Sequence, residues 1–239
     1  LGGMLTPFGN PQNLYLYSYF NIAAGEFFKI MALPFAVAFL LILGVCLFVK
    51  PEKAEVLSAP KKTPPVWRIA LYSALFVLSV LIVFRVFPYY WGLLAVTAAL
   101  LIFDFRAVLR VDYGLLFTFC AFFVFSGNMA RIPAVEEFLG GLVALDPLAF
   151  GVLSCQVISN VPSAVLLPKF TSDYANLLVA VNIGGLGTPI ASLASLITLN
   201  TYRRVCPGQT KKYIAKFLLL NFSFLAVLIG VGYLNVLIV

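Results

Sequence analysis

Long stretches of this chain contain no charged side chain, and six of them, each 16 to 29 residues long, are candidate membrane segments. A helix needs about 20 apolar residues to cross the hydrocarbon core of a membrane. Helices are favoured there because lipid offers the backbone no hydrogen-bond partners. The pattern therefore predicts an all-α, polytopic membrane protein. The stretches are 30–49, 69–84, 86–103, 113–130, 174–202 and 217–239.

Composition excludes the main alternative classes. Hydrophobic residues make up 62% of the chain and charged residues 10%, whereas soluble domains carry about 25% charge. A soluble enzyme, a disordered protein and a nucleic-acid-binding domain are therefore not expected. The chain has no histidine, so His-based catalysis and imidazole metal sites are absent, and its four cysteines form no CxxC pair. We expect no enzyme activity, no metal site and no organic cofactor.

The run 174–202 is too long for one straight crossing. A continuous helix of this length would measure about 43 Å, whereas the hydrocarbon core is about 30 Å thick. Three glycines and one proline fall within residues 184–189, near its middle. Both residue types disfavour a helix interior, so we predict an interrupted helix. In the run 30–49, by contrast, Pro34 is expected in the first turns of a helix, where proline is tolerated.

Residues 147–170 are predicted to form a re-entrant hairpin rather than a crossing. They contain three prolines and a polar Ser-Asn pair near the centre. Basic residues cluster in 50–68 and 203–216. In 131–146, by contrast, three of the four charged residues are acidic. The excess of Lys and Arg in cytoplasmic loops places both basic segments in the cytoplasm. This is consistent only if the hairpin enters and leaves on the outer side.

The chain also contains an internal repeat. Residues 2–14 align with residues 184–196 at a constant offset of 182, and five of the thirteen positions are identical, including a Gly-Gly and a Thr-Pro pair. Self-similarity over such a period indicates a duplicated architecture. The predicted crossings give the two segments opposite orientations, so the repeat is predicted to be inverted, as in many transporters.

The duplication sets the expected domain organisation. We expect one transmembrane transporter domain over 1–239, truncated at its N-terminus, because the segment that precedes the first copy is not in this sequence. Residues 1–50 would be the end of the first repeat, 51–68 a cytoplasmic loop and 69–239 the second repeat.

Two interrupted helices and a hairpin would enclose a polar cavity near the middle of the membrane. The N–H groups freed at a helix break favour an anion, and the freed carbonyls suit Na⁺. The polar side chains near both breaks are neutral, and a divalent cation usually needs carboxylates. The alternative for each small residue is simple helix packing.

Three motifs together resemble the ion-transporter superfamily, which includes citrate and dicarboxylate transporters, arsenite-permease-like anion permeases and some sodium/proton antiporters. The motifs lie at Thr6–Leu14 (TPFGNPQNL), Ile158–Ser163 (ISNVPS) and Gly184–Pro189 (GGLGTP). The chain resembles the C-terminal part of such a protein. In that family each half has a hairpin with a Ser-Asn tip, followed by an unwound helix.

The resemblance implies two sets of site residues. Those implied to bind substrate are Thr6, Asn10, Ser159, Asn160 and Thr188. Those implied to bind a cation are Gly3, Gly9, Ser159, Asn160, Gly184 and Gly187. The dicarboxylate branch typically reads Ser-Asn-Thr at the hairpin tip, whereas Val161 and Pro162 follow Asn160 here. This departure favours the broader anion-permease or arsenite-permease-like branch.

The expected function is secondary active transport of a small anion, of the citrate, dicarboxylate or arsenite type, coupled to Na⁺ or H⁺ by alternating access. A sodium/proton antiporter of the same superfamily and a non-transporting membrane subunit are the alternatives. Antiport normally uses carboxylates within the membrane. The predicted membrane segments contain no Asp or Glu. The expected location is the plasma or inner membrane, with a homodimer as one candidate assembly and no nucleic-acid partner.

Overall fold

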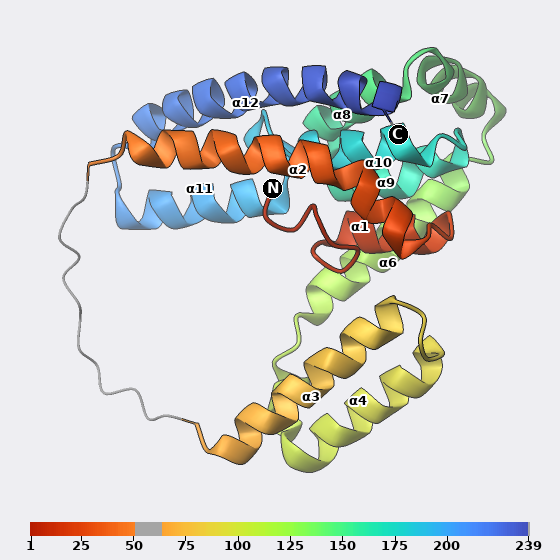
Figure 1. Ribbon diagram of the computed structural model, residues 1–239, viewed down its shortest axis with the longest axis vertical. Helices are drawn as coiled ribbons and strands as arrows, with labels where there is room; N and C mark the ends of the chain where they lie inside the picture. The colour runs from red at the N-terminus through yellow and green to blue at the C-terminus, as the bar shows by residue number, and fades with distance from the viewer. Residues whose placement is uncertain (51–63, 239) are drawn as a thin grey trace. The chain divides into compact units, whose positions relative to one another are not determined.

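The computed structural model describes residues 1–50 and 64–238, and every regular element within them is a helix. This confirms the predicted all-α class. The chain divides into two compact units (Figure 1). Unit 1 comprises Leu1–Val45 and Phe117–Val239, and unit 2 comprises Cys46–Leu116. Most of the predicted cytoplasmic loop 51–68 lies outside the described residues. The predicted division into two repeats stays a prediction.

Three described helices are long and apolar enough to cross a membrane. They are α2 (Ala24–Leu47), α3 (Val66–Val83) and α12 (Thr210–Ile238). A fourth span results if α6 (Tyr113–Met129) and α7 (Pro133–Leu145), which are bent by 98° at their junction, count as one. The run 86–103 forms only α4 (Tyr89–Phe103), about 22 Å long. The chain is a multi-pass membrane protein, with fewer full-length spans than uncharged runs.

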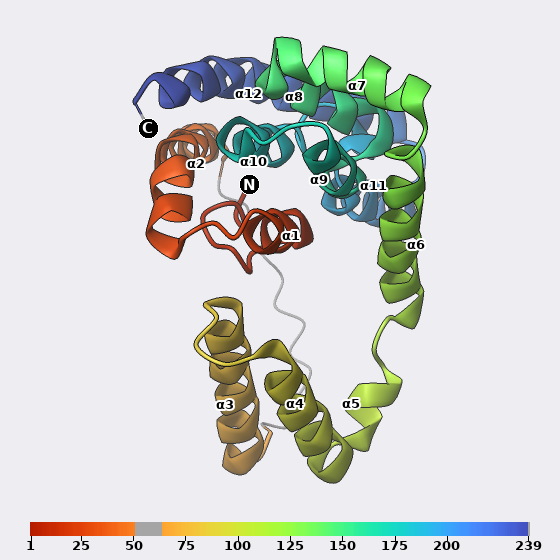
Figure 2. The same ribbon diagram turned by 90° about the vertical axis from the view of Figure 1, so that its right-hand side faces the viewer.

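Helix α10 (Tyr174–Ile183) is the central helix of unit 1. It packs against α1 (Pro11–Tyr19), α8 (Pro147–Ile158), α9 (Asn160–Leu166) and α12. Figure 2 shows α10 between α1 and α12. All side chains from 177 to 183 are buried, and Asn182 is the one polar side chain among them. A helix that is apolar on all sides belongs in a protein interior.

The run 174–202 is interrupted, as predicted from its glycines and proline. Helix α10 ends at Ile183, residues 184–192 form a break that contains the short η2 (Pro189–Ala191), and α11 (Leu193–Val205) follows. A first break, residues 1–10, precedes α1. Helices α1 and α11 begin 182 residues apart, at Pro11 and Leu193, which equals the offset between the two aligned sequence segments.

Residues 147–169 form a helical hairpin. Helices α8 and α9 pack against each other on either side of Ser159, and the single turn η1 (Leu167–Lys169) follows α9. The chain reverses at Ser159, whose φ of 77° lies in the left-handed region that residues with a Cβ rarely adopt.

Both ends of this hairpin are tied to the ends of long helices. Asp146, which caps α8, accepts a hydrogen bond from the hydroxyl of Tyr233 near the end of α12. Tyr174, at the start of α10, donates a 2.5 Å hydrogen bond to Glu26 near the start of α2. The predicted topology places these ends of α2 and α12 on the outer side. The two hydrogen bonds therefore support a hairpin that enters and leaves on one side.

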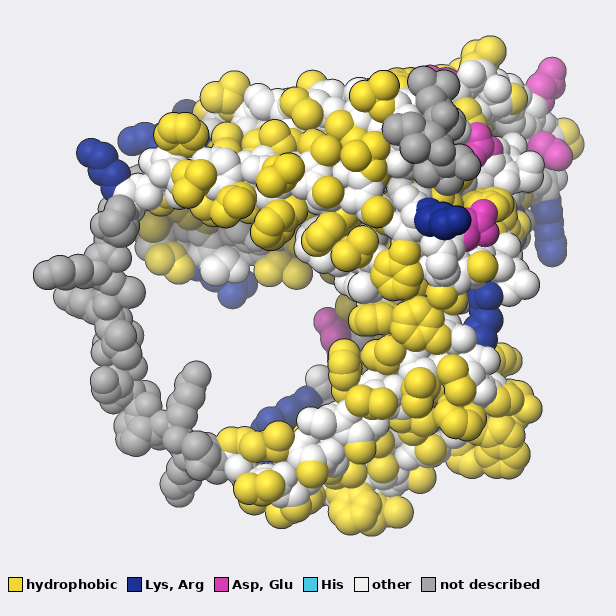
Figure 3. Space-filling model, viewed as in Figure 1, with side chains coloured by type: hydrophobic (Ala, Val, Ile, Leu, Met, Phe, Trp, Pro, Cys, Tyr) yellow, Lys and Arg dark blue, Asp and Glu magenta, His cyan; other side chains and the backbone are white. Residues whose placement is uncertain are grey.

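The surface of unit 1 is apolar with charge at its two ends. Large hydrophobic side chains are exposed along α2 and α12, among them Phe39, Leu40, Leu219 and Leu234. In Figure 3, Lys and Arg side chains gather where α11 ends and α12 begins, and the opposite end, near α7, carries acidic side chains together with some Lys and Arg. Lipid contact explains the apolar sides, and the basic cluster between α11 and α12 agrees with the predicted cytoplasmic side.

Pro34 does not lie in the first turns of its helix, as the sequence suggested. Helix α2 begins at Ala24, so Pro34 lies in its interior. A proline there has no N–H for the carbonyl four residues earlier, which belongs to Ile30. The buried Asn235 of α12 supplies the missing donor: its Nδ2 lies 2.9 Å from the Ile30 oxygen. The expectation was wrong because α2 begins at Ala24, whereas the uncharged run that located the helix in the sequence begins only at residue 30.

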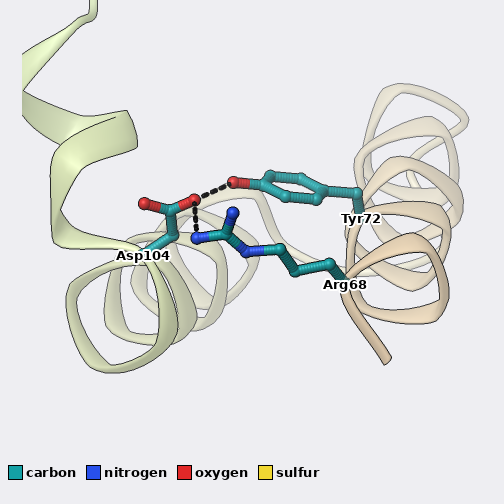
Figure 4. Close-up of polar contacts among 3 residues, drawn as sticks. All are labelled: Arg68, Tyr72 and Asp104. Atoms are coloured by element: carbon teal, nitrogen blue, oxygen red, sulfur yellow. Dashed lines mark hydrogen bonds and ion pairs between the residues drawn. The ribbon is translucent and has the colours of Figure 1, made fainter. Parts of the chain in front are cut away.

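Unit 2 is a helical hairpin of α3 and α4, followed by the short α5 (Phe105–Leu109). At its polar end, Asp104 accepts a 2.7 Å hydrogen bond from the Tyr72 hydroxyl and forms a 3.2 Å ion pair with Arg68 (Figure 4). The hydrogen bond from Tyr72, together with the charge of Arg68, lowers the pKa of Asp104 below its usual value. This cluster fastens the end of α4 to the start of α3.

Candidate functional site

The first break is organised by the fully buried side chain of Asn13. Its Nδ2 donates hydrogen bonds to the carbonyl oxygens of Gly3, Met4 and Thr6, at 3.1 to 3.2 Å. Its backbone N–H donates to Oδ1 of Asn10, which caps the start of α1. One amide group thus donates to carbonyls that lie outside regular helix, and the Thr6 carbonyl also accepts a 3.1 Å bond from the N–H of Gly9.

Close backbone contact explains two glycines of this break. A Cβ placed on Gly3 would overlap the carbonyl oxygen of Gly9, and a Cβ on Gly9 would overlap the carbonyl oxygen of Gly3. Any larger residue at either position would push these two backbone segments of the break apart. Gly3 and Gly9 therefore have a structural reason to be glycine, in addition to the predicted cation contact.

The second break is organised by Gln156 of α8. Its Nε2 lies 2.9 Å from the carbonyl oxygens of Gly184 and Leu186, and its Oε1 accepts a 2.9 Å hydrogen bond from the N–H of Thr188. The Thr188 hydroxyl donates back to the Gln156 carbonyl at 3.3 Å. Gly187 lies between these contacts, with a φ of 98° that favours glycine. Gln156 therefore serves the second break as Asn13 serves the first.

Asn182, in the last turn of α10, joins the two breaks. Its Nδ2 donates to Oδ1 of Asn13 at 2.6 Å, and its Oδ1 accepts from Nδ2 of Asn10 at 3.1 Å. The same Nδ2 also lies 2.8 Å from the Leu178 carbonyl, one turn earlier in α10. Asn182 lies two residues before the second break. Its contacts therefore hold the start of the second break next to the start of α1.

The hairpin tip lies against the second break. The Ser159 hydroxyl donates to the Ala191 carbonyl at 3.3 Å, and a Cβ on Gly185 would lie 3.0 Å from Nδ2 of Asn160. Asn160 is 7% exposed, yet within the described part of the chain its side chain has no hydrogen-bond partner. Among the described residues no buried side-chain N or O atom lacks a partner, so the unpartnered amide of Asn160 reaches the surface of the hairpin tip and is available to a ligand.

The structure gathers most of the predicted site residues. Around the second break and the hairpin tip lie Ser159, Asn160, Gly184, Gly187 and Thr188. Around the first break lie Gly3, Gly9 and Asn10. Thr6 is the weakest member of the set, because its recorded contacts involve its carbonyl oxygen rather than its hydroxyl. Ligand binding by all of these residues stays a prediction.

Sequence analysis did not single out Gln156 or Asn182 as site residues. Both are uncharged amides within otherwise apolar helices, one turn before Asn160 and two residues before Gly184. Their position next to the predicted motifs is the signal that could have found them. Their partners, however, lie 28 to 32 and 169 to 172 residues away, beyond the reach of local patterns.

The chemistry of this region is that of neutral hydrogen-bonding groups. The side chains that organise both breaks and the hairpin tip are amides and hydroxyls, which can bind an anion through N–H and O–H donors. The first turn of α11 adds backbone N–H groups at the positive end of a helix dipole. Among the described residues, no group of three or more His, Cys, Asp or Glu side chains is placed to hold a metal ion.

Comparison with known proteins agrees with this arrangement. The model of the citrate transporter family matches residues 1–176. The chain is 35% identical over 204 residues to the inner membrane protein YbiR of Escherichia coli, covering 83% of this chain and 54% of that protein. It is 34% identical over 222 residues to the uncharacterized transporter MJ0456 of Methanocaldococcus jannaschii, covering 92% and 59%.

The chain thus spans a little over half the length of these two relatives. The family match covers the first break, α8 and the hairpin tip. The matched residues therefore include Asn13, Gln156 and Asn160. These findings confirm the resemblance inferred from the three sequence motifs. The chain belongs to the citrate transporter family of membrane transporters.

Proposed function

We propose that this chain forms the solute-binding part of a secondary transporter that moves a small anion by alternating access, coupled to Na⁺ or H⁺. The neutral amide and hydroxyl groups between the two breaks would bind the anion, with Asn160 and Ser159 at the hairpin tip as its nearest contacts. Family membership supports transport, whereas the solute and the coupling ion belong to the proposal.

The observation that carries the proposal is the state of Asn160. The residue is 7% exposed, its side chain lies against the second break, and its amide has no internal hydrogen bond in the described part of the chain. The neighbouring Asn13 and Asn182, by contrast, bond their amides within the protein. An amide left open beside an interrupted helix suits a ligand that enters and leaves.

The departure at the hairpin tip guides the choice of solute. Val161 and Pro162 follow Asn160, so the tip offers one hydroxyl, from Ser159, and one amide. A tip with fewer donors suits a compact anion better than a large tricarboxylate. We therefore place arsenite-type and small carboxylate anions ahead of citrate among the candidates.

Uptake into proteoliposomes that contain the full-length protein tests the proposal. Radiolabelled citrate, a four-carbon dicarboxylate and arsenite would be offered under an inward Na⁺ gradient, an inward H⁺ gradient and no gradient. We expect gradient-dependent uptake of at least one anion. Absence of gradient-dependent uptake for every anion would contradict the proposal.

The variant Asn160→Ala separates a transporter from a non-transporting subunit. Because Asn160 makes no internal hydrogen bond, its truncation should abolish uptake while membrane abundance and thermal stability stay close to those of the wild type. Asn176→Ala is the matched control, since Asn176 bonds only to Asp173 in the first turn of α10. Unchanged uptake by Asn160→Ala would remove Asn160 from the binding site.

A further inference from the structure

Carbonyl groups at both breaks converge on a nitrogen atom of the chain itself. At the first break, three carbonyl oxygens lie 3.1 to 3.2 Å from Nδ2 of Asn13. At the second, the carbonyl oxygens of Gly184 and Leu186 each lie 2.9 Å from Nε2 of Gln156. Clusters of carbonyls at helix breaks are the groups that coordinate Na⁺ in transporters of this architecture.

The orientation of each amide is fixed by a partner on its oxygen. Oδ1 of Asn13 accepts from the Asn182 amide, and Oε1 of Gln156 accepts from the Thr188 N–H. An amide rotated by 180° would place its oxygen against carbonyl oxygens and its NH₂ against an N–H donor. The hydrogen-bond network therefore requires the NH₂ group to face the carbonyls at both breaks.

We propose that Asn13 and Gln156 are positioning residues that take the place of a bound cation, so that the carbonyl clusters at both breaks hold an internal NH₂ group instead of Na⁺. An amide NH₂ carries partial positive charge and two donors, and it neutralises converging carbonyl dipoles without a formal charge. The same device occurs at two breaks that are 182 residues apart, with donors from two different elements, α1 and α8.

This inference refines the proposed function by placing any coupling cation away from the break carbonyls. It also narrows the cation set implied by the family resemblance, because the carbonyls of Gly3 and Gly184 accept hydrogen bonds from the two amides. It is tested by stability rather than by uptake, so its failure and the failure of the proposed function remain distinguishable.

The test compares the thermal stability of the full-length protein in sodium chloride and in choline chloride at equal ionic strength and alkaline pH. Gln156→Glu replaces the NH₂ group by an oxygen of almost the same size and turns the carbonyl cluster into a site with a carboxylate. Asn13→Asp makes the same change at the first break. Gln209→Glu, on an exposed side chain between α11 and α12, is the matched control.

We expect Gln209→Glu to show the same difference in Tm between the two salts as the wild type, because any Na⁺ site away from the breaks is intact in both proteins. Gln156→Glu should have a Tm lower by about 5 °C or more in choline and should recover much of the loss in sodium, because Na⁺ then occupies the vacated position. A role for Gln156 in packing alone would lower Tm equally in both salts.

Two results would overturn the proposal. One is a sodium-dependent rise in Tm of the same size in the wild type and in Gln156→Glu. The other is a loss of stability in Gln156→Glu that sodium leaves unchanged. If Gln156→Glu does not fold, Asn13→Asp is judged by the same criteria.

Discussion

The amide of Asn182 donates a 2.6 Å hydrogen bond to the Oδ1 of Asn13, which lies 169 positions earlier in the chain. Through this bond the last turn of α10 holds the residue that satisfies the carbonyls of the first break. Asn10 completes the connection by donating to Asn182. The two breaks are therefore mechanically joined at one buried point rather than held separately.

Replacing Asn182 by leucine should destabilise the protein markedly. The leucine leaves the buried Asn13 oxygen without its partner, at a cost of about 1–3 kcal/mol for an unsatisfied group, and it also removes the acceptor of the half-buried Asn10 amide. The Tm of the purified protein measures this loss. Asn176→Leu, which removes only a bond to Asp173 within the same turn, should cost less. Equal losses would show that the connection between the breaks adds nothing to stability.

Gly9→Ala should disrupt the first break. Its methyl group would overlap the carbonyl oxygen of Gly3, and the backbone must separate to admit it. Overpacking of this kind typically costs about 1–3 kcal/mol. Gly2→Ala provides the control, because no atom lies within 4 Å of the added methyl group. Thermal unfolding of both variants checks the difference, and a Gly9→Ala protein as stable as Gly2→Ala would contradict the close contact.

Asn235 and Pro34 should show strong energetic coupling. Asn235→Leu leaves the Ile30 carbonyl without its side-chain donor, and we expect a cost of about 1–3 kcal/mol. In the Pro34→Ala background the new backbone N–H can bond to Ile30, so the same substitution should cost much less. A double-mutant cycle on the free energy of unfolding measures the coupling. Additive effects would mean that Asn235 does not compensate for Pro34.

Asp104 should give unit 2 an acid-sensitive contact. The bond from Tyr72 and the charge of Arg68 lower the pKa of Asp104, so the folded state favours the ionised carboxylate. Its stabilising effect is complete above the unfolded pKa, about 3.9, and disappears as the pH falls through the lower folded value. Asp104→Asn should therefore have a lower Tm than the wild type at pH 7.

The difference between Asp104→Asn and the wild type should shrink once the pH falls well below about 3.9, where both side chains are neutral. Glu137→Gln, on the exposed surface of α7, serves as a control for the loss of one negative charge. A difference in Tm that stays constant from pH 7 down to acid would contradict an effect of the Asp104 charge.

Local sequence patterns predicted the parts of this fold that local physics determines. The absence of charge over 174–202 indicated a membrane segment, and the glycines and proline at 184–189 indicated where its helix breaks. The prolines and the Ser-Asn pair of 147–170 indicated a hairpin for the same reason. These features depend on residues close together in the chain, so the sequence alone reveals them.

Contacts between distant segments could not be predicted in this way. Nothing near Pro34 indicates that Asn235 compensates for it, and nothing near Gln156 indicates that it bonds to Gly184. Likewise, the apolar character of α10 fits a lipid-facing helix as well as the buried central helix that it forms. Such relationships arise only when the helices pack.

The amides that meet around the two breaks have a consequence for energetics across the bilayer. Since Asn10, Asn13, Gln156, Asn160 and Asn182 are neutral, a rearrangement of this centre moves no formal charge of its own. The membrane potential does about 2.3 kcal/mol of work per elementary charge at 100 mV. It would then act only on the transported solute and on the ions that cross with it. The charge that crosses the membrane for each solute molecule would therefore equal the summed charge of the solute and its coupled ions.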